Sequence, residues 1–211
     1  MEINYICSLG SLCHTACFMK RNNFKFESYP FDWIFSNHNN IIHCIENNFQ
    51  AFLDKSFYYT ISDSECGHYY YDTFLCNPMW RHHNPLLNVN HYEYIQRCVA
   101  RFQNLIKFDK PKLFIMTFVN FSDVEDKIMI ELLEFNNTFS KYAKNYTLLV
   151  IFHLPDKFEN YHNFKKIGNI HFLTLHTKSK SDGISFYDEN DNLYLDSVIN
   201  YNYNFIPFIP F

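Results

Sequence analysis

The sequence predicts an α/β protein in which helices flank a mainly parallel sheet, in a Rossmann-like or flavodoxin-like arrangement, within one domain spanning residues 1–211. Short apolar runs alternate with longer segments of helical period, which is the pattern of βαβ units. The expected strands are continuously apolar, as strands buried on both faces of a parallel sheet are; they cover residues 3–8, 112–119, 146–152 and 170–175. The 4 glycines are too few for an all-β fold with many tight turns.

The N-terminal segment predicts a strand, a tight turn and a helix. After the strand over 3–8, the chain turns at Gly10-Ser11 and enters a helix over 12–21, with Ser11 as its expected N-cap. Residues 28–34, Ser-Tyr-Pro-Phe-Asp-Trp-Ile, form an aromatic turn that Pro30 keeps out of a helix. Apolar residues at helical spacing predict further helices over 41–53, 91–108 and 124–142.

Two segments lack a clear period. Residues 54–90 are rich in Tyr, His, Cys and Pro, and we interpret them as an irregular aromatic and histidine-rich insert, a kind of segment that is often functional. Residues 201–211 form an apolar tail with Pro207 and Pro210. This tail is expected to pack on the surface or to contact a partner.

Charge and composition exclude several classes of function. A net charge of -4 provides no basic field for nucleic acid, and no apolar run is long enough to span a membrane. The start of the chain lacks the features of a signal peptide, and seven irregularly spaced cysteines indicate reduced thiols, so we expect an intracellular, cytoplasmic protein. Cys13 and Cys17 lack a second Cys/His pair at zinc-finger spacing, so neither a metal nor a cofactor is expected.

Cys13 is the candidate nucleophile. The expected strand, turn and helix place it in the first turn of the helix, where free N–H groups and the positive end of the dipole lower the pKa of a thiol. The alternative is a buried structural cysteine, because free cysteines are among the most commonly buried residues.

A thiolate needs a base. His82 and His83 lie in an irregular segment, and a loop can carry an imidazole to a distant thiol. Further candidates are His68, His153, His171 and His176. Asp32, flanked by large aromatic residues, is expected either to orient a histidine, as the third member of a triad does, or to brace its own turn.

Four residues are candidates for substrate binding. Arg97 and Arg101 lie four apart on one helix face, where they either hold an anionic substrate or pair with acids. Ser11 and Trp33, which lie close to Cys13 and Asp32 in the sequence, complete the set. The sequence does not choose between a protein, a peptide and a glycan as substrate.

The motifs around Cys13 and Asp32 resemble a known family. Residues 8–13, Ser-Leu-Gly-Ser-Leu-Cys, together with Ala16 and the Pro-Phe-Asp-Trp turn at 30–33, resemble the family described as putative papain-like cysteine peptidases of unknown function, found in bacteria and giant DNA viruses. The family's central His is matched by His82 or His83, and its helix by Tyr94, Arg97, Arg101 and Phe102. The resemblance covers roughly residues 3–120.

This resemblance implies a cysteine-dependent hydrolase or acyl transferase, with Cys13 as nucleophile and His82 or His83 as base. It also implies an alternative fold, the papain-like α+β arrangement, in which the cysteine begins a long helix and the histidine lies on a later antiparallel sheet.

Other functions remain open at the level of sequence. An SGNH-type esterase would use Ser8 or Ser11, and Asp182-Gly183-Ile184-Ser185 is similar to its late block, although Ser185 stands where that block has a histidine. A sugar-processing enzyme such as a glycosyltransferase is a second alternative. A non-catalytic module that binds a partner or glycan through the aromatic residues of 58–80 is a third.

Overall fold

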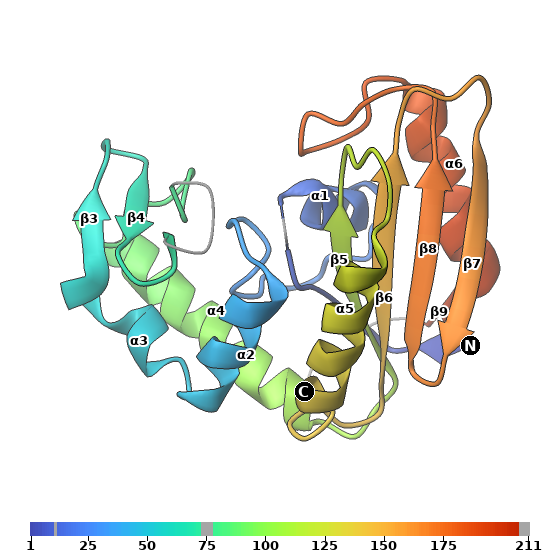
Figure 1. Ribbon diagram of the computed structural model, residues 1–211. Coiled ribbons are helices and arrows are strands. Elements are labelled where there is room, and N and C mark those ends of the chain that lie inside the picture. The colour runs from blue at the N-terminus through green and yellow to red at the C-terminus, as the bar shows by residue number, and fades with distance from the viewer. Residues whose placement is uncertain (11, 73–77, 207–211) are drawn as a thin grey trace.

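The computed structural model describes residues 1–10, 12–72 and 78–206. Its main sheet has five strands in the order β2-β5-β6-β8-β7 (Figure 1). These strands are β2 (Tyr5–Ser8), β5 (Lys112–Phe118), β6 (Tyr146–Leu154), β8 (Ile170–His176) and β7 (Tyr161–Ile167). The first four are parallel, and β7 runs antiparallel to β8 at the edge. The prediction of a mainly parallel sheet is therefore confirmed.

The order of the strands differs from the finer expectation. Strand β2 lies at an edge of the sheet, and the strand order does not reverse beside it. Rossmann and flavodoxin sheets place their first strand in the interior and reverse their order there. The structure therefore has a mixed α/β fold whose strand order is not that of a Rossmann or flavodoxin sheet.

Helices cover both faces of the sheet (Figure 1). Helices α1 (His14–Arg21) and α6 (Glu189–Asn202) pack on one face, around a core that includes Phe18, Leu113 and Leu195. On the other face lie α2 (His38–Glu46), α4 (Val89–Lys107) and α5 (Asp126–Phe139), whose core includes Phe102 and Phe114. Both faces of the parallel strands are thus buried, which is why these strands are continuous apolar runs.

The helices begin and end where local side chains favour it. Helix α4 begins at Asn88, whose side chain accepts the N–H groups of Asn90 and His91. The expected helix over 41–53 is interrupted, because Asn48 and Phe49 adopt left-handed backbone angles, with φ of 53° and 61°. Helix α2 therefore ends at Glu46, and a short helix α3 (Gln50–Leu53) follows.

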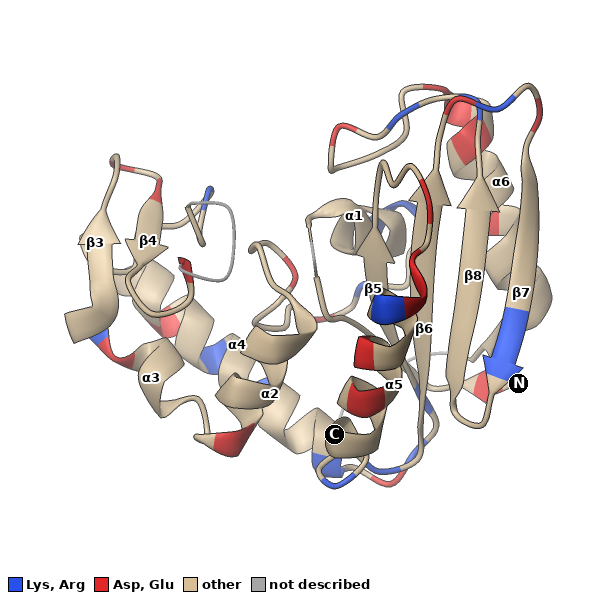
Figure 2. Ribbon diagram, viewed as in Figure 1, with Lys and Arg blue, Asp and Glu red and all other residues tan. Residues whose placement is uncertain are grey.

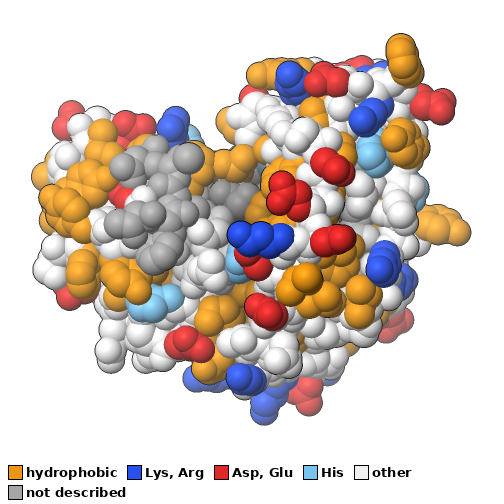
Figure 3. Space-filling view, in the orientation of Figure 1, with side chains coloured by type: hydrophobic (Ala, Val, Ile, Leu, Met, Phe, Trp, Pro, Cys, Tyr) orange, Lys and Arg blue, Asp and Glu red, His pale blue; other side chains and the backbone are white. Residues whose placement is uncertain are grey.

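Between α3 and α4 the chain builds a small lobe, which we call the aromatic lobe (described residues 55–72 and 78–88). It contains η1 (Lys55–Phe57) and a hairpin of β3 (Tyr58–Thr60) and β4 (Cys66–His68). Tyr58, Tyr71 and Trp80 are buried in it. In the space-filling view the outline is indented between this lobe and the main sheet (Figure 3). Across the described residues the antiparallel pairs are this hairpin, β7 with β8, and isolated bridges, so the papain-like alternative of an antiparallel sheet bearing the histidine is not observed.

The two ends of the described chain lie side by side. Strand β1 (Glu2–Ile3) pairs in parallel with β9 (Asn204–Phe205). The expected strand over 3–8 is broken at Asn4, where the N–H groups of Asn4 and Tyr5 both donate to the Pro111 carbonyl. Of the expected tail, residues 201–206 finish α6 and form β9, and residues 207–211 lie outside the described residues. None of the helices in the described ranges is both long and apolar enough to cross a bilayer.

Candidate active site

The turn between β2 and α1 is fixed by hydrogen bonds from three sides. The Gly10 N–H donates to Ser8 Oγ at 3.1 Å, and the Gly10 carbonyl accepts the N–H of Thr117 at 3.2 Å. The Ser36 hydroxyl donates to the Leu9 carbonyl at 2.9 Å. Gly10 has a φ of +87°, and a Cβ there would lie 1.8 Å from Ser36 Oγ, so both the backbone angle and the available space require glycine.

This turn delivers Cys13 to the start of α1. Cys13 is the N-cap residue, with φ −66° and ψ −15°, and its carbonyl accepts the Cys17 N–H at 2.9 Å. Its side chain is half-buried. The expected position at a helix N-terminus, outside the apolar core, is therefore observed. Ser11, the expected N-cap and substrate-binding residue, lies outside the described residues.

The acidity of Cys13 is opposite to the expectation. Burial, with a smaller contribution from the neighbouring Cys17, raises the pKa of its thiol to about 11, while a backbone hydrogen bond and the charge of Arg81 oppose the rise. The position at a helix N-terminus was expected to lower this pKa, but the loss of hydration outweighs the opposing contributions. The thiol is therefore protonated at neutral pH in the resting structure, and its chemistry requires a base.

The segment that carries both candidate bases is tied to the Pro-Phe-Asp-Trp turn. Trp80 forms an antiparallel bridge with Ile34, and the Phe35 N–H donates to the Met79 carbonyl at 3.3 Å. The guanidinium of Arg81 lies 5.2 Å from the centroid of the Phe35 ring. The charge of Arg81 also lowers the pKa of the Cys13 thiol, so the start of this segment lies within electrostatic range of the candidate nucleophile.

The two histidines differ in environment. His82 is exposed, whereas His83 is half-buried and stacks on the Tyr94 ring, with centroids 5.0 Å apart. Burial, with smaller contributions from the charges of His91 and His82, lowers the pKa of His83 to about 4. His83 is therefore neutral at pH 7 and able to accept a proton, although a pKa this low makes it a weak base in the resting structure. Within the described part of the chain, neither His82 nor His83 hydrogen-bonds to Cys13 or Asp32.

Asp32 has a different partner from the one expected of a triad member. It is fully buried, and its carboxylate accepts the Tyr29 N–H at 2.8 Å and pairs with the ammonium of Lys25. Burial raises the pKa of Asp32, while the charge and hydrogen bond of Lys25 and the Tyr29 N–H oppose the rise. The structure thus shows the second expected role, in which Asp32 braces its own turn.

The expected substrate-binding residues Trp33, Arg97 and Arg101 converge on one surface groove. We call it the basic groove; it has a volume of about 560 Å³ and is lined by Lys20, Lys25, Phe26, Glu27, Ser28, Trp33, Tyr94, Arg97 and Arg101. This volume lies within the range of small-molecule sites. Trp33 and Tyr94 also line a small adjoining pocket with His83, so the groove and the candidate base share a wall.

Sequence reasoning missed Lys20, Lys25 and Arg81 as site residues. Arg81 directly precedes His82, so its position in the histidine segment was a usable signal. No spacing rule joins Lys25 to Asp32 across an irregular turn. His14, next to Cys13, is also buried, with neither ring nitrogen hydrogen-bonded among the described residues; its ring packs 4.6 Å from Phe186.

The residues of the esterase alternative have structural roles. Ser8 is fully buried, and its hydroxyl accepts the Gly10 N–H. The Asp182 carboxylate accepts the N–H groups of Ile184 and Ser185, which closes a local turn. The binding-module alternative loses part of its surface, because Tyr58, Tyr71 and Trp80 form the core of the aromatic lobe, whereas Tyr69 and Tyr70 remain exposed.

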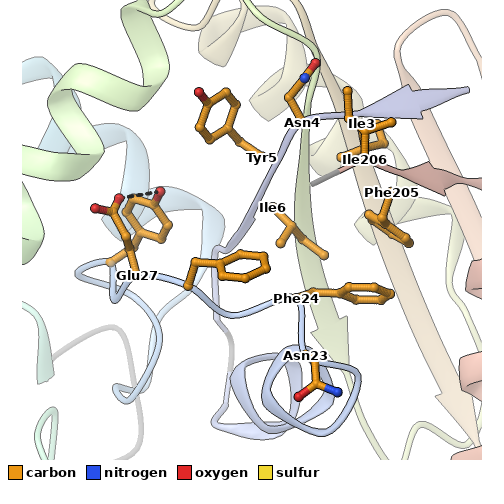
Figure 4. A pocket seen from close by; sticks show the side chains of 11 residues that line it. Ile3, Asn4, Tyr5, Ile6, Asn23, Phe24, Glu27, Phe205 and Ile206 are labelled. Carbon is orange, nitrogen blue, oxygen red and sulfur yellow. Dashed lines mark hydrogen bonds between the residues drawn. The ribbon is translucent and has the colours of Figure 1, made fainter. Parts of the chain in front are cut away.

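A second, apolar pocket lies at the free edge of β2 and shares Phe26 and Glu27 with the basic groove (Figure 4). Ile3, Ile6, Phe24, Phe205 and Ile206 are among the residues that line it. Its volume of about 230 Å³ is below the usual range for ligand sites, and Cys13 is not among its lining residues. Over the described ranges, no group of three or more His, Cys, Asp or Glu side chains is arranged to hold a metal ion.

Comparison with known proteins agrees with the resemblance in the motifs. No curated protein and no solved structure matches the chain. A family model matches residues 4–155, a range that includes Cys13, the Pro-Phe-Asp-Trp turn, the two adjacent histidines and both arginines of α4. Because the match spans well over half of the 211 residues, the chain belongs to the family described as "Putative papain-like cysteine peptidase (DUF1796)".

Proposed function

We propose that this protein is a cysteine-dependent hydrolase or acyl transferase that uses Cys13 as its nucleophile, with peptides as the substrates that the family description suggests. One observation carries the proposal. The half-buried Cys13 begins a helix that follows the carboxyl end of a parallel strand, and its thiol lies within range of the charge of Arg81, the residue before the two histidines. Carboxyl ends of parallel strands are the usual location of sites in open α/β sheets.

The reaction begins with deprotonation. With a pKa of about 11, the Cys13 thiol is a weak nucleophile until an imidazole removes its proton. The thiolate then attacks the acyl carbon, and the leaving group departs with the proton that the imidazole holds. Water or a second nucleophile cleaves the thioester, which releases the acyl product and returns a proton to the thiol. Free N–H groups in the first turn of α1 supply donors for the developing oxyanion.

His83 is the better of the two candidate bases. It is neutral at pH 7 and half-buried, and it lines a pocket together with Trp33, which also lines the basic groove. His82 is exposed to solvent. The proposal requires the His83 segment to approach Cys13 when substrate binds, since catalytic contacts often tighten only in the complex.

Acyl-enzyme trapping tests this proposal. The protein is incubated either with peptidyl acyloxymethyl ketones, which alkylate a nucleophilic thiol with loss of a carboxylate, or with thioester substrates, which acylate it, and the adducts are located by mass spectrometry. Cys13→Ser should lose the adduct, and His83→Gln should slow its formation by about 10²-fold or more. Cys17→Ser, a half-buried thiol one helical turn away, is the matched control and should retain the adduct. An adduct that persists in Cys13→Ser, or that depends on Cys17, would overturn the assignment.

A further inference from the structure

One face of α1 leads from the nucleophile to the basic groove. Cys17 and Lys20 follow Cys13 at intervals of four and three residues, so the three side chains lie along one side of the helix. Burial raises the pKa of the Cys17 thiol, and the charges of Lys20, Arg21 and Lys25 oppose that rise. The cationic side chains at and just beyond the C-terminal end of α1 therefore lie close enough to Cys17 to affect the pKa of its thiol.

The basic groove differs in charge from the rest of the molecule. Its lining includes four cationic side chains and one carboxylate, that of Glu27. The whole chain carries a net charge of -4, and elsewhere charges of both signs lie on the helices and on the loops that join the strands (Figure 2). A concave surface lined mainly by one sign of charge concentrates its field and attracts ligands of the opposite sign.

The two arginines of the groove are only weakly engaged. Arg97 lies 3.9 Å from Glu93, and Arg101 lies 3.7 Å from Glu27, in pairs that are partly or largely exposed. Exposed pairs at such distances contribute little to stability. Lys25, in contrast, is held by the buried Asp32. Arg101 also donates a long hydrogen bond of 3.4 Å to the Ser28 carbonyl. Each guanidinium group still has further N–H donors for an oxyanion of a ligand, for which its planar geometry is suited.

We propose that the basic groove binds an anionic group of the substrate, a carboxylate or a phosphate, about 10 Å from the acyl carbon that Cys13 attacks. The proposal rests on the function proposed above. This distance is the rise along α1 from Cys13 to Lys20, a groove residue seven positions later, at about 1.5 Å per residue in a helix. An extended peptide covers this distance in about three residues. The preferred substrate thus carries an acidic or phosphorylated side chain about three residues from the bond that is cleaved.

Equilibrium binding tests the groove without catalysis. The Cys13→Ala protein is titrated with four hexapeptides that carry Glu, Gln, Lys or phosphoserine at the same central position. Trp33 lines the groove, with Lys25 Nζ 5.6 Å from its ring centroid, whereas Trp80 is buried, so tryptophan fluorescence reports binding there. The Glu and phosphoserine peptides should bind at least about fivefold more tightly than the Gln peptide, and the Lys peptide should bind most weakly.

Variants identify the residues responsible. Arg97→Gln and Arg101→Gln should each weaken binding of the Glu and phosphoserine peptides about fivefold and leave the Gln peptide unaffected. Lys127→Gln, on the exposed surface of α5, is the matched control and should change nothing. Raising the salt concentration from 50 to 300 mM should reduce the preference for anions. The order of the phosphoserine and Glu peptides distinguishes a phosphate from a carboxylate as the preferred group.

The two proposals can fail separately. Equal affinity for the Glu and Gln peptides, no binding of any peptide, or unchanged affinity in both arginine variants would overturn the anion site. Selective binding of the anionic peptides supports it, even if the unmodified protein forms no acyl adduct at Cys13. That last result would count against the proposed hydrolase and not against the groove.

Discussion

Replacing Lys25 with Met should remove the ammonium group that pairs with the Asp32 carboxylate in the Pro-Phe-Asp-Trp turn. The Asp32 side chain is fully buried, and that of Lys25 is 9% exposed, so the solvent cannot compensate for the loss. One oxygen of the carboxylate already lacks a partner among the described residues. Removing one partner of a buried ion pair costs about 3–5 kcal/mol, and we expect a loss of this size in the free energy of unfolding.

Urea and thermal unfolding, followed by circular dichroism, measure this effect. For a chain of this length the loss corresponds to a decrease in Tm of roughly 6–20 °C. Asp32→Asn should also destabilise the protein, and the double variant should cost about 2 kcal/mol less than the sum of the two, because it leaves no unpaired buried charge. Lys127→Met is the control: its side chain is 81% exposed and 3.9 Å from Glu131, so its loss should cost at most about 0.5 kcal/mol.

The pH dependence gives the sign of the effect. Burial raises the pKa of Asp32, and loss of Lys25 raises it further, so the folded state of the Lys25→Met variant holds a proton more tightly than the unfolded state does. Stability of this kind is present at low pH and is lost as the pH rises through the folded-state pKa. The deficit of Lys25→Met should therefore shrink as the pH falls from 7 toward 5, whereas that of Asp32→Asn should not. A Lys25→Met cost equal to that of Lys127→Met would refute the buried pair.

Three further results are expected. Iodoacetamide should alkylate Cys13 slowly at pH 7 and faster as the pH approaches the thiol pKa of about 11. Arg81→Gln should move this pH profile to higher pH, because it removes a charge that lowers the pKa. Mass spectrometry of the Cys13 peptide measures both rates, and fast alkylation at pH 7 would contradict the burial argument. An NMR titration should place the midpoint of His83 near its pKa of about 4, and a midpoint above 6 would contradict its burial. Gly10→Ala should lower the free energy of unfolding by more than about 2 kcal/mol, because the added Cβ would overlap the hydroxyl of Ser36. Gly168→Ala, at a φ of +60° with open space around it, should lower it by only about 1 kcal/mol. Equal losses in urea unfolding would contradict the close contact at Gly10.

The sequence was sufficient to predict the four parallel strands of the sheet, because they are continuous apolar runs, but not the antiparallel edge strand β7, whose side chains are mostly exposed. The apolar runs around Phe114 and Val150 became β5 and β6, and the turn with Gly10 did place Cys13 at the start of a helix. The strand order was not accessible in this way. It depends on which edges pair, and β2 lies at the edge although its residues are as buried as those of an interior strand.

The electrostatics of the site were less predictable, because they depend on burial and on distant partners. Position in a helix suggested a low pKa for Cys13, but its burial raises it. Asp32 and Lys25 pair across an irregular turn that no periodicity describes. The stacking of His83 on Tyr94 joins two segments whose relative position only the tertiary fold determines. Arg97 and Arg101 were expected either to hold a ligand or to pair with acids. In the structure both arginines line a groove, and each also lies within 4 Å of a glutamate carboxylate.

The sheet and the segment that follows α1 have different tasks in this molecule. The parallel strands fix the turn that carries Cys13, through the bonds of Gly10 to β2 and to Thr117 of β5. Every other residue assigned to the site comes from α1 itself or from the chain between α1 and β5, including Trp33, Arg81 and His83. The lobe and the sheet share one continuous core, to which Tyr58 and Trp80 of the lobe and Phe114 of the sheet all belong. Since His83 and Cys13 are not hydrogen-bonded to each other in the described part of the chain, catalysis in the proposed mechanism requires the His83 segment to approach Cys13 when substrate binds.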